Sequence, residues 1–488
     1  MLFTAAYRPD PLFERLGPEF ADPVQPADFP ARTIRFRNQR AAATIGLEAL
    51  TDEEWVAHFA RFEPLPDNQK QPLAMRYHGH QFRVYNPDLG DGRGFLYAQL
   101  REAGSGRLLD LGTKGSGQTP YSRDGDGRLT LKGGIREVLA AAMLEALGAP
   151  TSRSFSLIET GEALWRSDEP SPTRSAVLTR LSDSHIRFGS FQRHAAMDRP
   201  DLIETLLGHV VETYYPHLGN AQNRAAALLG AVVDRSAHLA ARWIAAGFVH
   251  GVLNSDNMNI TGESFDYGPY RFLPRNDPNF VAAYFDHTGL YSFGRQPEAV
   301  LWNLRQLAGA LTLASEPEPL AEALNMFWGA YREALRAAML ERMGLTPHSS
   351  EEDIDLVNAA FRALADGGEA LRWEPFFFDW FGGRLSEPRA MAGPRAELYA
   401  SEAFADFRAK LAVYEMDRPE RLASPYFARS EPEELLYDEI EALWAAIAER
   451  DDWAPFEAKL AAIEVAREGW DPSGGASSCW PASRFHPP

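Results

Sequence analysis

Residues 248–268 read FVHGVLNSDNMNITGESFDYG, and this segment decides the fold class of the chain. It contains His250, then the adjacent pair Asp256 and Asn257, and later Asp266. Carboxylate and amide oxygens suit hard cations such as Mg²⁺ and Mn²⁺, which also bind phosphates. The alternative is a plain polar turn in which the Asp–Asn pair caps local structure. The order of His, Asp–Asn and a second Asp favours a metal-dependent phosphate site over that turn.

The same order is typical of the catalytic loops of protein kinases. There, a His is followed by an Asp base and by an Asn that binds metal, and the Asp of a later DFG motif also binds metal. In this chain Val252 occupies the position of the kinase base, and Asp256 directly precedes the Asn. Residues 265–268, FDYG, stand where DFG would be. The segment therefore predicts a kinase-like site in which the acidic residue is Asp256 and not the residue at the position of the kinase base.

The residues on either side of this segment differ in periodicity. On the N-terminal side, residues 73–100 and 107–115 predict strands. Residues 131–150, LKGGIREVLAAAMLEALGAP, predict a helix, because apolar residues recur at helical spacing before a terminating Gly and Pro. From about residue 185 onward, helical patterns dominate. The predicted fold is α+β: a protein-kinase-like two-lobe fold with a small strand-rich N-lobe containing one helix and a large, mainly helical C-lobe.

The change in character near residue 185 places the predicted boundary between the lobes. We expect the N-terminal lobe to span residues 1–184 and the C-terminal lobe residues 185–488. Residues 1 to about 70 are rich in Pro and polar residues, so we expect a loosely organised N-terminal extension. The Gly-, Ser- and Pro-rich end of the chain predicts a mobile tail from about residue 468.

Lys114 and Glu137 are candidates for a phosphate-binding ion pair. Lys114 ends a predicted strand, and Glu137 lies on the helix that follows it. An ammonium at a strand end can neutralise phosphate charge, as the strand lysine of kinases does when a helix glutamate holds it. The alternative is an exposed lysine beside a surface glutamate, which contributes little stability. The order of strand and helix fits the first interpretation.

Two glycine-rich turns are candidates for contact with phosphates, because glycine leaves backbone N–H groups unobstructed. The first contains Gly90, Gly92 and Arg93, whose guanidinium could add a forked donor. Taken alone, this turn is better explained as a hairpin. The second contains Asp126 and Gly127, and a surface turn explains it equally well.

Arg180 and Arg187 are candidates for binding a terminal phosphate. Arg180 ends a predicted strand, and Arg187 lies in the loop that follows. Two such guanidinium groups could converge on one anion through paired N–H donors. In a chain this rich in arginine, a pair of surface salt bridges is a strong alternative.

The composition restricts the class of protein. A chain of 488 residues exceeds what one hydrophobic core usually supports, and 45% apolar residues is ordinary for a globular protein. The formal net charge of −19 argues against a nucleic-acid partner. The only cysteine, Cys479, cannot form an intramolecular disulfide. Without a secretory signal or a run of about 18 apolar residues, we expect a cytoplasmic protein with no membrane partner.

Taken together, these motifs are similar to those of the selenoprotein O family of protein adenylyltransferases, often called pseudokinases. The resemblance runs from about residue 78 to 308 in family order. The matching blocks are HGHQF, LGDGRG, TKGSGQTPYSRDGDGR, IRE, ALGAPTSRSFSLIETGE, VLTRLSDSHIRFGSF, HGVLNSDNMNI, FDYGP and QPEAVLWNLRQLA. This ordered set is far more specific than any single motif.

The resemblance implies a kinase-like fold that binds ATP in an inverted orientation, with the α-phosphorus facing the incoming hydroxyl. AMP would pass to Ser, Thr or Tyr of protein substrates, pyrophosphate would leave, and Mg²⁺ or Mn²⁺ would be the cofactor. It further implies Asp256 as the proton acceptor and Asn257 and Asp266 as metal ligands. The positions that match nucleotide-binding residues are Gly90, Gly92, Arg93, Lys114 with its partner Glu137, Asp126, Gly127, Arg180, Arg187 and Asp266.

The chain departs from the family pattern in two places. Some members pair a C-terminal cysteine or selenocysteine with a cysteine near the metal loop, but residues 276–289 contain none. We therefore expect no disulfide regulation. Residues after about 310 also match less well, so we expect substrate selection to differ. Two alternatives to AMP transfer stay open: UMP transfer from UTP with Mn²⁺, and a non-catalytic nucleotide-binding scaffold, which Val252 at the kinase base position supports.

Overall fold

The computed structural model describes residues 3–471 and has an α+β fold built on an antiparallel sheet. The strand order is β1-β3-β6-β7-β10-β9-β2, and β8 pairs with β10. The strands of this main sheet are β1 (Ala21–Pro23), β2 (Thr33–Arg37), β3 (Leu73–Met75), β6 (Leu96–Arg101), β7 (Leu108–Lys114), β8 (Leu129–Thr130), β9 (Arg153–Leu164) and β10 (Thr173–Ser182). Two short antiparallel pairs lie outside it: β4 (Gly79–Gln81) with β5 (Val84–Asn86), and β11 (Phe248–Val249) with β12 (Arg271–Phe272).

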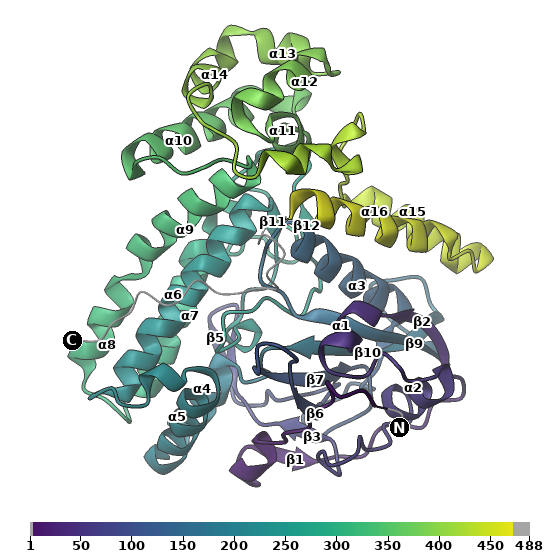
Figure 1. Cartoon of the computed structure of the whole chain (residues 1–488). Helices are drawn as coiled ribbons and strands as arrows, with labels where there is room; N and C mark the ends of the chain where they lie inside the picture. The colour runs from purple at the N-terminus through teal and green to yellow at the C-terminus, as the bar shows by residue number, and fades with distance from the viewer. Residues whose placement is uncertain (1–2, 472–488) are drawn as a thin grey trace.

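Both faces of the main sheet are covered by helices (Figure 1). Side chains alternate along β9 and β10, because successive residues of a strand point to opposite faces. Leu157 and Leu178 join the core shared with α3 (Leu131–Ala146). Ile158 and Val177 join a second core. That core includes residues of α1 (Gln39–Thr44) and α2 (Asp52–Phe59).

Helix α3 confirms the helix predicted at residues 131–150. Thr130 begins it, since its side chain accepts a hydrogen bond from the backbone N–H of Gly133. Gly148, at φ +75°, follows its end. The helix packs on β9 and β10 and buries Glu137 toward the sheet. Its position therefore sets where that carboxylate lies.

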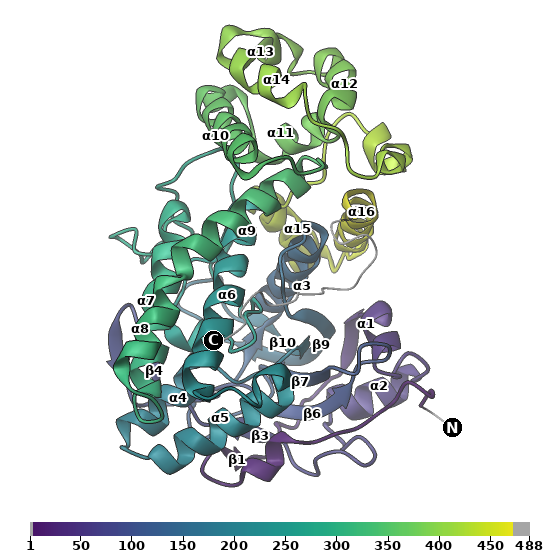
Figure 2. The ribbon, with the colours of Figure 1, turned by 60° about the vertical axis from the view of Figure 1, so that its left-hand side comes forward.

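The rest of the chain up to residue 434 is mainly helical and lies to one side of the sheet (Figures 1 and 2). Its α-helices are α4 (Phe188–Ala196), α5 (Pro200–Tyr214), α6 (Arg224–Ala245), α7 (Gln296–Leu311), α8 (Pro317–Asn325), α9 (Phe327–Arg342), α10 (Ser350–Asp366), α11 (Trp373–Trp380), α12 (Glu387–Ala392), α13 (Ala396–Ala400) and α14 (Ala405–Leu411). Short 3₁₀ turns connect elements along the chain: η1 (Phe13–Leu16), η2 (Pro216–Leu218), η3 (Ser255–Asn257), η4 (Phe293–Arg295), η5 (Gly368–Ala370), η6 (Gly383–Ser386), η7 (Glu402–Phe404), η8 (Pro419–Ala423) and η9 (Pro425–Ala428).

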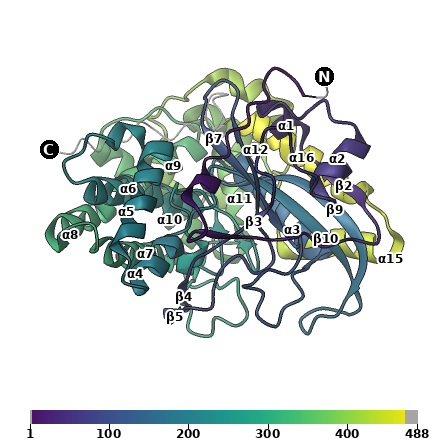
Figure 3. The ribbon, with the colours of Figure 1, turned by 90° about the horizontal axis from the view of Figure 1, so that it is seen from below.

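Helix α6 delivers the loop singled out by the sequence. Asn223 caps its start by accepting from the N–H of Ala226, and Gly247, at φ +61°, follows its end. The helix packs against α7, α8 and α9. Directly after it, β11 pairs with β12, so the residues between these strands form a closed loop. Viewed from below, α4 to α9 lie on one side and the strands of the main sheet on the other (Figure 3).

The last two helices return to the sheet. Helices α15 (Tyr437–Arg450) and α16 (Ala454–Trp470) lie beside α3, and α16 packs directly on it (Figure 1). The predicted mobile tail from about residue 468 begins too early, because α16 continues to Trp470, whose side chain is buried. The remainder of that tail, including Cys479, lies outside the described residues.

Two expectations about the N-terminal part are wrong. Among the described residues, the segment from 3 to about 70 is not loosely organised: β1 pairs with β3, β2 pairs with β9, and α1 and α2 pack on the sheet. The strand-rich part accordingly contains three α-helices and not one. The physical reason is that β2 is stabilised by pairing with a strand distant in sequence, which local composition does not reveal. Among the described helices, none is long and apolar enough to cross a membrane.

We predict that Trp55 contributes strongly to stability, because α2 is part of the sheet core. Its indole is fully buried, stacks on Phe155 at 4.9 Å and donates to Ser156 Oγ at 2.8 Å. Trp55→Ala should lower the free energy of unfolding by about 3–5 kcal/mol. Chemical denaturation checks this, with Trp165→Ala as the control because Trp165 is 74% exposed. Equal effects of the two substitutions would contradict the packing of α2.

Candidate active site

Lys114 lies at the centre of a buried cluster of charges. It ends β7, and its ammonium donates hydrogen bonds to the carboxylates of Glu137 on α3 and Asp266 in the loop before β12. Lys114 is 5% exposed and Glu137 2%. The predicted Lys114–Glu137 ion pair is therefore confirmed, and the interpretation as an exposed surface pair is wrong. The structure adds Asp266 as a second partner.

A buried histidine holds the loop that carries Asp266 in place. His250 is fully buried, and its Nε2 lies 2.9 Å from the carbonyl oxygen of Phe265. Burial lowers the pKa of His250, so the neutral ring donates this hydrogen bond. Asp266 itself has φ +65°, a backbone conformation that residues other than glycine adopt mainly when surrounding contacts impose it. The loop thus presents the carboxylate to Lys114.

Two arginines, Arg180 and Arg187, add positive charge next to Lys114, and we call these three residues the cationic wall. Arg180 on β10 places Nη1 3.5 Å from Asp266 Oδ1, and Arg187 donates to Asp91 Oδ1 at 3.2 Å. Both guanidinium groups lie over the ring of Phe265. The two side chains are buried, so the alternative of surface salt bridges is wrong.

Several donors of these arginines make no hydrogen bond to the protein. Nε of Arg180 and Nε of Arg187 are buried and have no hydrogen-bond partner among the described residues, and Nη1 of Arg180 makes only its 3.5 Å ion-pair contact with Asp266. Buried polar groups are normally satisfied, and leaving a charged one unmet is costly. The unmet N–H groups beside an ammonium therefore indicate the binding of an anion with several oxygens, such as a polyphosphate.

Asp256 lies on the other side of Arg187, in η3. Arg187 Nη1 donates to the backbone carbonyl of Asp256 at 2.8 Å. The side chain is buried, and its Oδ1 has no hydrogen-bond partner among the described residues. Burial raises the pKa of Asp256 to about 6, against the opposing charge of Arg187. The carboxyl is thus a free acceptor close to the cationic wall.

Asn257 and Asp266 are the candidate metal ligands. Asn257 Nδ2 donates to the carbonyl of Val252 at 3.1 Å, which fixes the amide and leaves Oδ1 as its other end. Burial alone would raise the pKa of Asp266, but nearby cations, Lys114 foremost, hold it well below its ordinary range. Residues 3–471 contain no group of three His, Cys, Asp or Glu side chains arranged to hold a metal. One amide and one carboxylate oxygen fit Mg²⁺ or Mn²⁺, which take further ligands from phosphates and water.

The first glycine turn is packed against the loop that follows β7. A Cβ on Gly90 would lie 2.3 Å from the ring of Tyr121, and one on Gly92 would lie 2.8 Å from its carbonyl oxygen. Arg93 is exposed, and its carbonyl accepts from the N–H of Gly115 at 2.6 Å. Glycine is required here for the close approach of two loops.

In the second glycine turn, the side chain of Asp126 makes its contacts outside the cluster. Asp126 is exposed, forms an ion pair with Arg166 at 2.8 Å and accepts from the N–H of Arg128. Gly127, at φ +69°, packs against Gly117, where a Cβ would lie 2.3 Å from backbone atoms. The structure therefore does not bring Asp126 into contact with the Lys114 cluster. Asp126 instead lines an open groove next to Gln25.

Asp91 is a site residue that the sequence analysis missed. Its carboxylate accepts from Arg187 and from the backbone N–H of Met75 at 3.1 Å, and its carbonyl accepts from Thr119. Asp91 thus orients a guanidinium of the cationic wall and joins it to the glycine turn. The only signal was an acid between two glycines, and this is also the commonest hairpin sequence.

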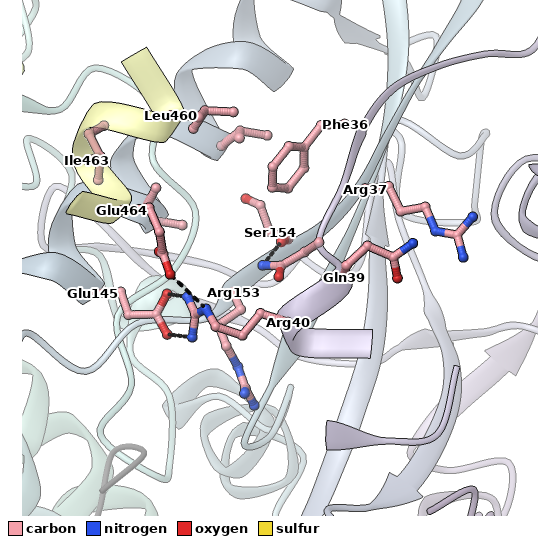
Figure 4. Close-up of a pocket in the computed structure, with 14 residues that line it drawn as sticks. Phe36, Arg37, Gln39, Arg40, Glu145, Arg153, Ser154, Leu460, Ile463 and Glu464 are labelled. Atoms are coloured by element: carbon pink, nitrogen blue, oxygen red, sulfur yellow. Dashed lines mark hydrogen bonds and ion pairs between the residues drawn. The ribbon is translucent and has the colours of Figure 1, made fainter. Parts of the chain in front are cut away.

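A pocket of about 220 Å³ lies next to α3, and neither Lys114 nor Asp266 lines it (Figure 4). Residues of β2, α1, α3, β9 and α16 line it. At its edge Arg40 donates to Glu145 of α3 at 2.9 Å and lies 3.7 Å from Glu464 of α16. These contacts tie α3, the helix that carries Glu137, to α1 and α16.

The geometry defines an enzyme-like site for a polyphosphate next to two carboxylates. Comparison with known proteins gives the same class. The family model described as protein adenylyltransferase SelO matches residues 2–464. Proteins named protein nucleotidyltransferase YdiU are similar to the chain: the one from Gloeobacter violaceus is 47% identical over 92% of this chain and 93% of that protein. The one from Synechococcus elongatus is 44% identical over 92% and 94%.

A more distant relative of the same name, from Pseudomonas putida, is 41% identical over 74% of this chain and 73% of that protein. The chain belongs to the SelO family of protein adenylyltransferases. This confirms the family predicted from the ordered motifs. It is therefore a member of a family of nucleotidyltransferases.

We predict that the buried arginines bind pyrophosphate. In metal-free buffer, millimolar pyrophosphate should raise the Tm of the wild-type protein, because a ligand that binds only the folded state stabilises it. Arg180→Gln should reduce that shift by at least half, since it removes unmet donors of the cationic wall. Arg362→Gln is the control, because Arg362 forms an exposed ion pair with Asp406. The same shift in Arg180→Gln as in wild type would exclude Arg180 from anion binding.

Proposed function

We propose that this protein transfers AMP from ATP to Ser, Thr or Tyr hydroxyls of other proteins and releases pyrophosphate. The observation that carries the proposal is the position of one cationic wall, formed by Lys114, Arg180 and Arg187, next to a buried carboxyl with a free oxygen. Family membership supports nucleotidyl transfer, and ATP is the donor that an adenylyltransferase requires.

The proposed fold is the kinase-like arrangement of two lobes, with residues 1–184 as the N-terminal lobe and residues 185–488 as the C-terminal lobe. ATP lies inverted between them. The β- and γ-phosphates contact the cationic wall, and the α-phosphorus faces Asp256. This orientation is favoured because the leaving pyrophosphate accumulates the most negative charge, and the buried guanidinium donors without hydrogen-bond partners can stabilise that charge.

The proposed reaction is a displacement at the α-phosphorus. The acceptor hydroxyl oxygen forms a bond to that phosphorus, and the bond from it to the bridging oxygen of pyrophosphate breaks. The hydroxyl proton passes to Asp256, whose raised pKa suits a proton acceptor near neutral pH. The leaving pyrophosphate gains negative charge, which Lys114 and the two arginines stabilise.

Asn257 and Asp266 would hold Mg²⁺ or Mn²⁺, which when bound neutralises phosphate charge. Glu137 keeps Lys114 oriented, and Asp91 does the same for Arg187. Gly90, Gly92 and Arg93 form the turn that covers the nucleotide. Asp126 and Gly127 belong to a separate turn, and we propose that they reach the nucleotide only from its outer end.

We predict that label from the α-phosphate of ATP, and not from the γ-phosphate, appears on protein in the presence of Mg²⁺ or Mn²⁺. Asp266→Asn should lower the rate at least about 100-fold, because it removes a metal ligand and a partner of Lys114. Asp277→Asn is the matched control, since Asp277 is exposed in the segment that follows. Transfer of γ-label would overturn the proposal.

The same assay separates the two alternatives. If labelled UTP with Mn²⁺ is the better donor, the protein is a uridylyltransferase that uses the same residues. If nucleotide raises the Tm but no label is transferred from either donor, the protein is a non-catalytic scaffold. Asp256→Asn should lower transfer by about 10²–10⁴-fold if Asp256 accepts the proton.

A further inference from the structure

Exposed apolar side chains lie beside the loop that carries Asp256. Val84, in the β4–β5 hairpin, is 70% exposed. Tyr284 and Phe285, in the segment between β12 and α7, are 79% and 41% exposed. Single exposed apolar residues are normal on protein surfaces, but a contiguous group indicates an interaction site. We call Phe82, Val84, Tyr284 and Phe285 the aromatic ledge.

Ring contacts join the two segments of the aromatic ledge. Phe82 packs against Phe285 with ring centroids 5.8 Å apart, and Phe285 against Tyr284 at 5.1 Å. Phe82 also packs against the buried ring of Tyr291 at 5.1 Å. The ledge is therefore anchored to the core through its inner ring, while its outer side chains face solvent.

The hairpin is bonded directly to the loop of Asp256. The backbone N–H of His80 donates to Ser255 Oγ at 2.7 Å, and that of Phe82 donates to Asn254 Oδ1 at 3.0 Å. At the near end of β4, a Cβ on Gly79 would lie 3.2 Å from Asp256 Cβ. The hairpin therefore begins against the proposed proton acceptor and extends away from it toward the ledge.

The hairpin tip is held in an uncommon conformation. Phe82 and Arg83 have φ +50° and +64°, a region that residues other than glycine seldom adopt. The guanidinium of Arg83 lies 5.5 Å from the ring of Trp302 on α7. Such conformations persist where surrounding contacts impose them and are commonest at functional sites. The tip is thus fixed in a geometry that presents Val84 outward.

We propose that the aromatic ledge binds an apolar or aromatic side chain of the protein acceptor, in an extended segment that carries the modified hydroxyl. The inference rests on the proposed function, because the acceptor hydroxyl must reach Asp256. The segment that delivers it passes along the hairpin, and the ledge is the apolar surface continuous with that path. From Gly79 to the hairpin tip is about 10 Å, the length of about three extended residues. The preferred acceptor therefore carries the apolar residue about three positions from its hydroxyl.

The test uses synthetic peptides with one serine and a Phe three positions before or after it, each matched by a peptide with Gly in place of Phe. Peptide binding is measured by fluorescence anisotropy with a non-hydrolysable ATP analogue, and transfer by label from the α-phosphate of ATP. The wild-type protein should prefer one Phe peptide over its Gly match by about tenfold in Kd and in kcat/KM, as burial of one aromatic side chain predicts.

The variant Val84→Ser with Tyr284→Ser should bring that ratio close to one. The control, Trp328→Ser with Val413→Ser, changes two exposed apolar residues elsewhere and should keep the tenfold ratio. Thermal unfolding checks that each variant is folded; if the double variant is not, Tyr284→Ser alone replaces it, with the ratio expected to fall at least threefold.

The outcomes separate the ledge from the reaction. Binding preference without transfer of label would refute the proposed function and leave the ledge as a peptide site. Transfer without a Phe preference, or a preference that survives in the ledge variant, would refute the ledge. A wild-type dimer that the ledge variant converts to a monomer would also refute it, by showing that a second copy of the chain occupies this surface.

Discussion

The ammonium of Lys114 lies between the carboxylates of Glu137 and Asp266, and the candidate site depends on this three-way contact. The three residues belong to strand β7, helix α3 and the loop before β12. Removing one partner from a buried ion pair leaves the other charge poorly solvated and typically costs about 3–5 kcal/mol. The contact therefore fixes sheet, helix and loop relative to one another. Because the contact fixes Asp266, it also sets the position of the carboxylate next to Arg180.

The position of α3 depends in turn on the end of the described chain. Lys132, in the first turn of α3, donates to Glu441 of α15 at 2.7 Å, and α16 packs along α3. Arg40 links α1 to Glu145 near the other end of the helix. Helices α15 and α16, which lie late in the chain, thus help to hold α3, which lies in its N-terminal part. A change in the packing of α15 and α16 on α3 would therefore displace Glu137 and, through it, Lys114.

The sequence predicted the parts of the site that depend on local pattern. Helix α3 follows from apolar periodicity, and the Lys114–Glu137 pair follows from the order of strand and helix. The pairing of β2 with β9 was missed, because the two strands are far apart in the chain and the N-terminal residues are rich in Pro. Burial of Arg180 and the role of Asp91 were equally invisible, since arginine and Asp–Gly are ordinary surface sequences. For Asp126 the local sequence left a phosphate contact and a surface turn equally open, and in the structure its side chain pairs with Arg166 and not with the cluster.

The displacement of the acid from Val252 to Asp256 has a structural consequence on the acceptor side. Asp256 lies in η3, whose residues the β4–β5 hairpin contacts directly. Gly79 permits this approach, because a side chain there would press on Ser255 and Asp256 at 3.2 Å. The free oxygen of Asp256 is thus enclosed between the cationic wall and the hairpin. A nucleotide would approach it from the side of the cationic wall and a polypeptide from the side of the hairpin. The carboxyl of Asp256 therefore lies between the two surfaces that would bind the two substrates of an AMP transfer to protein.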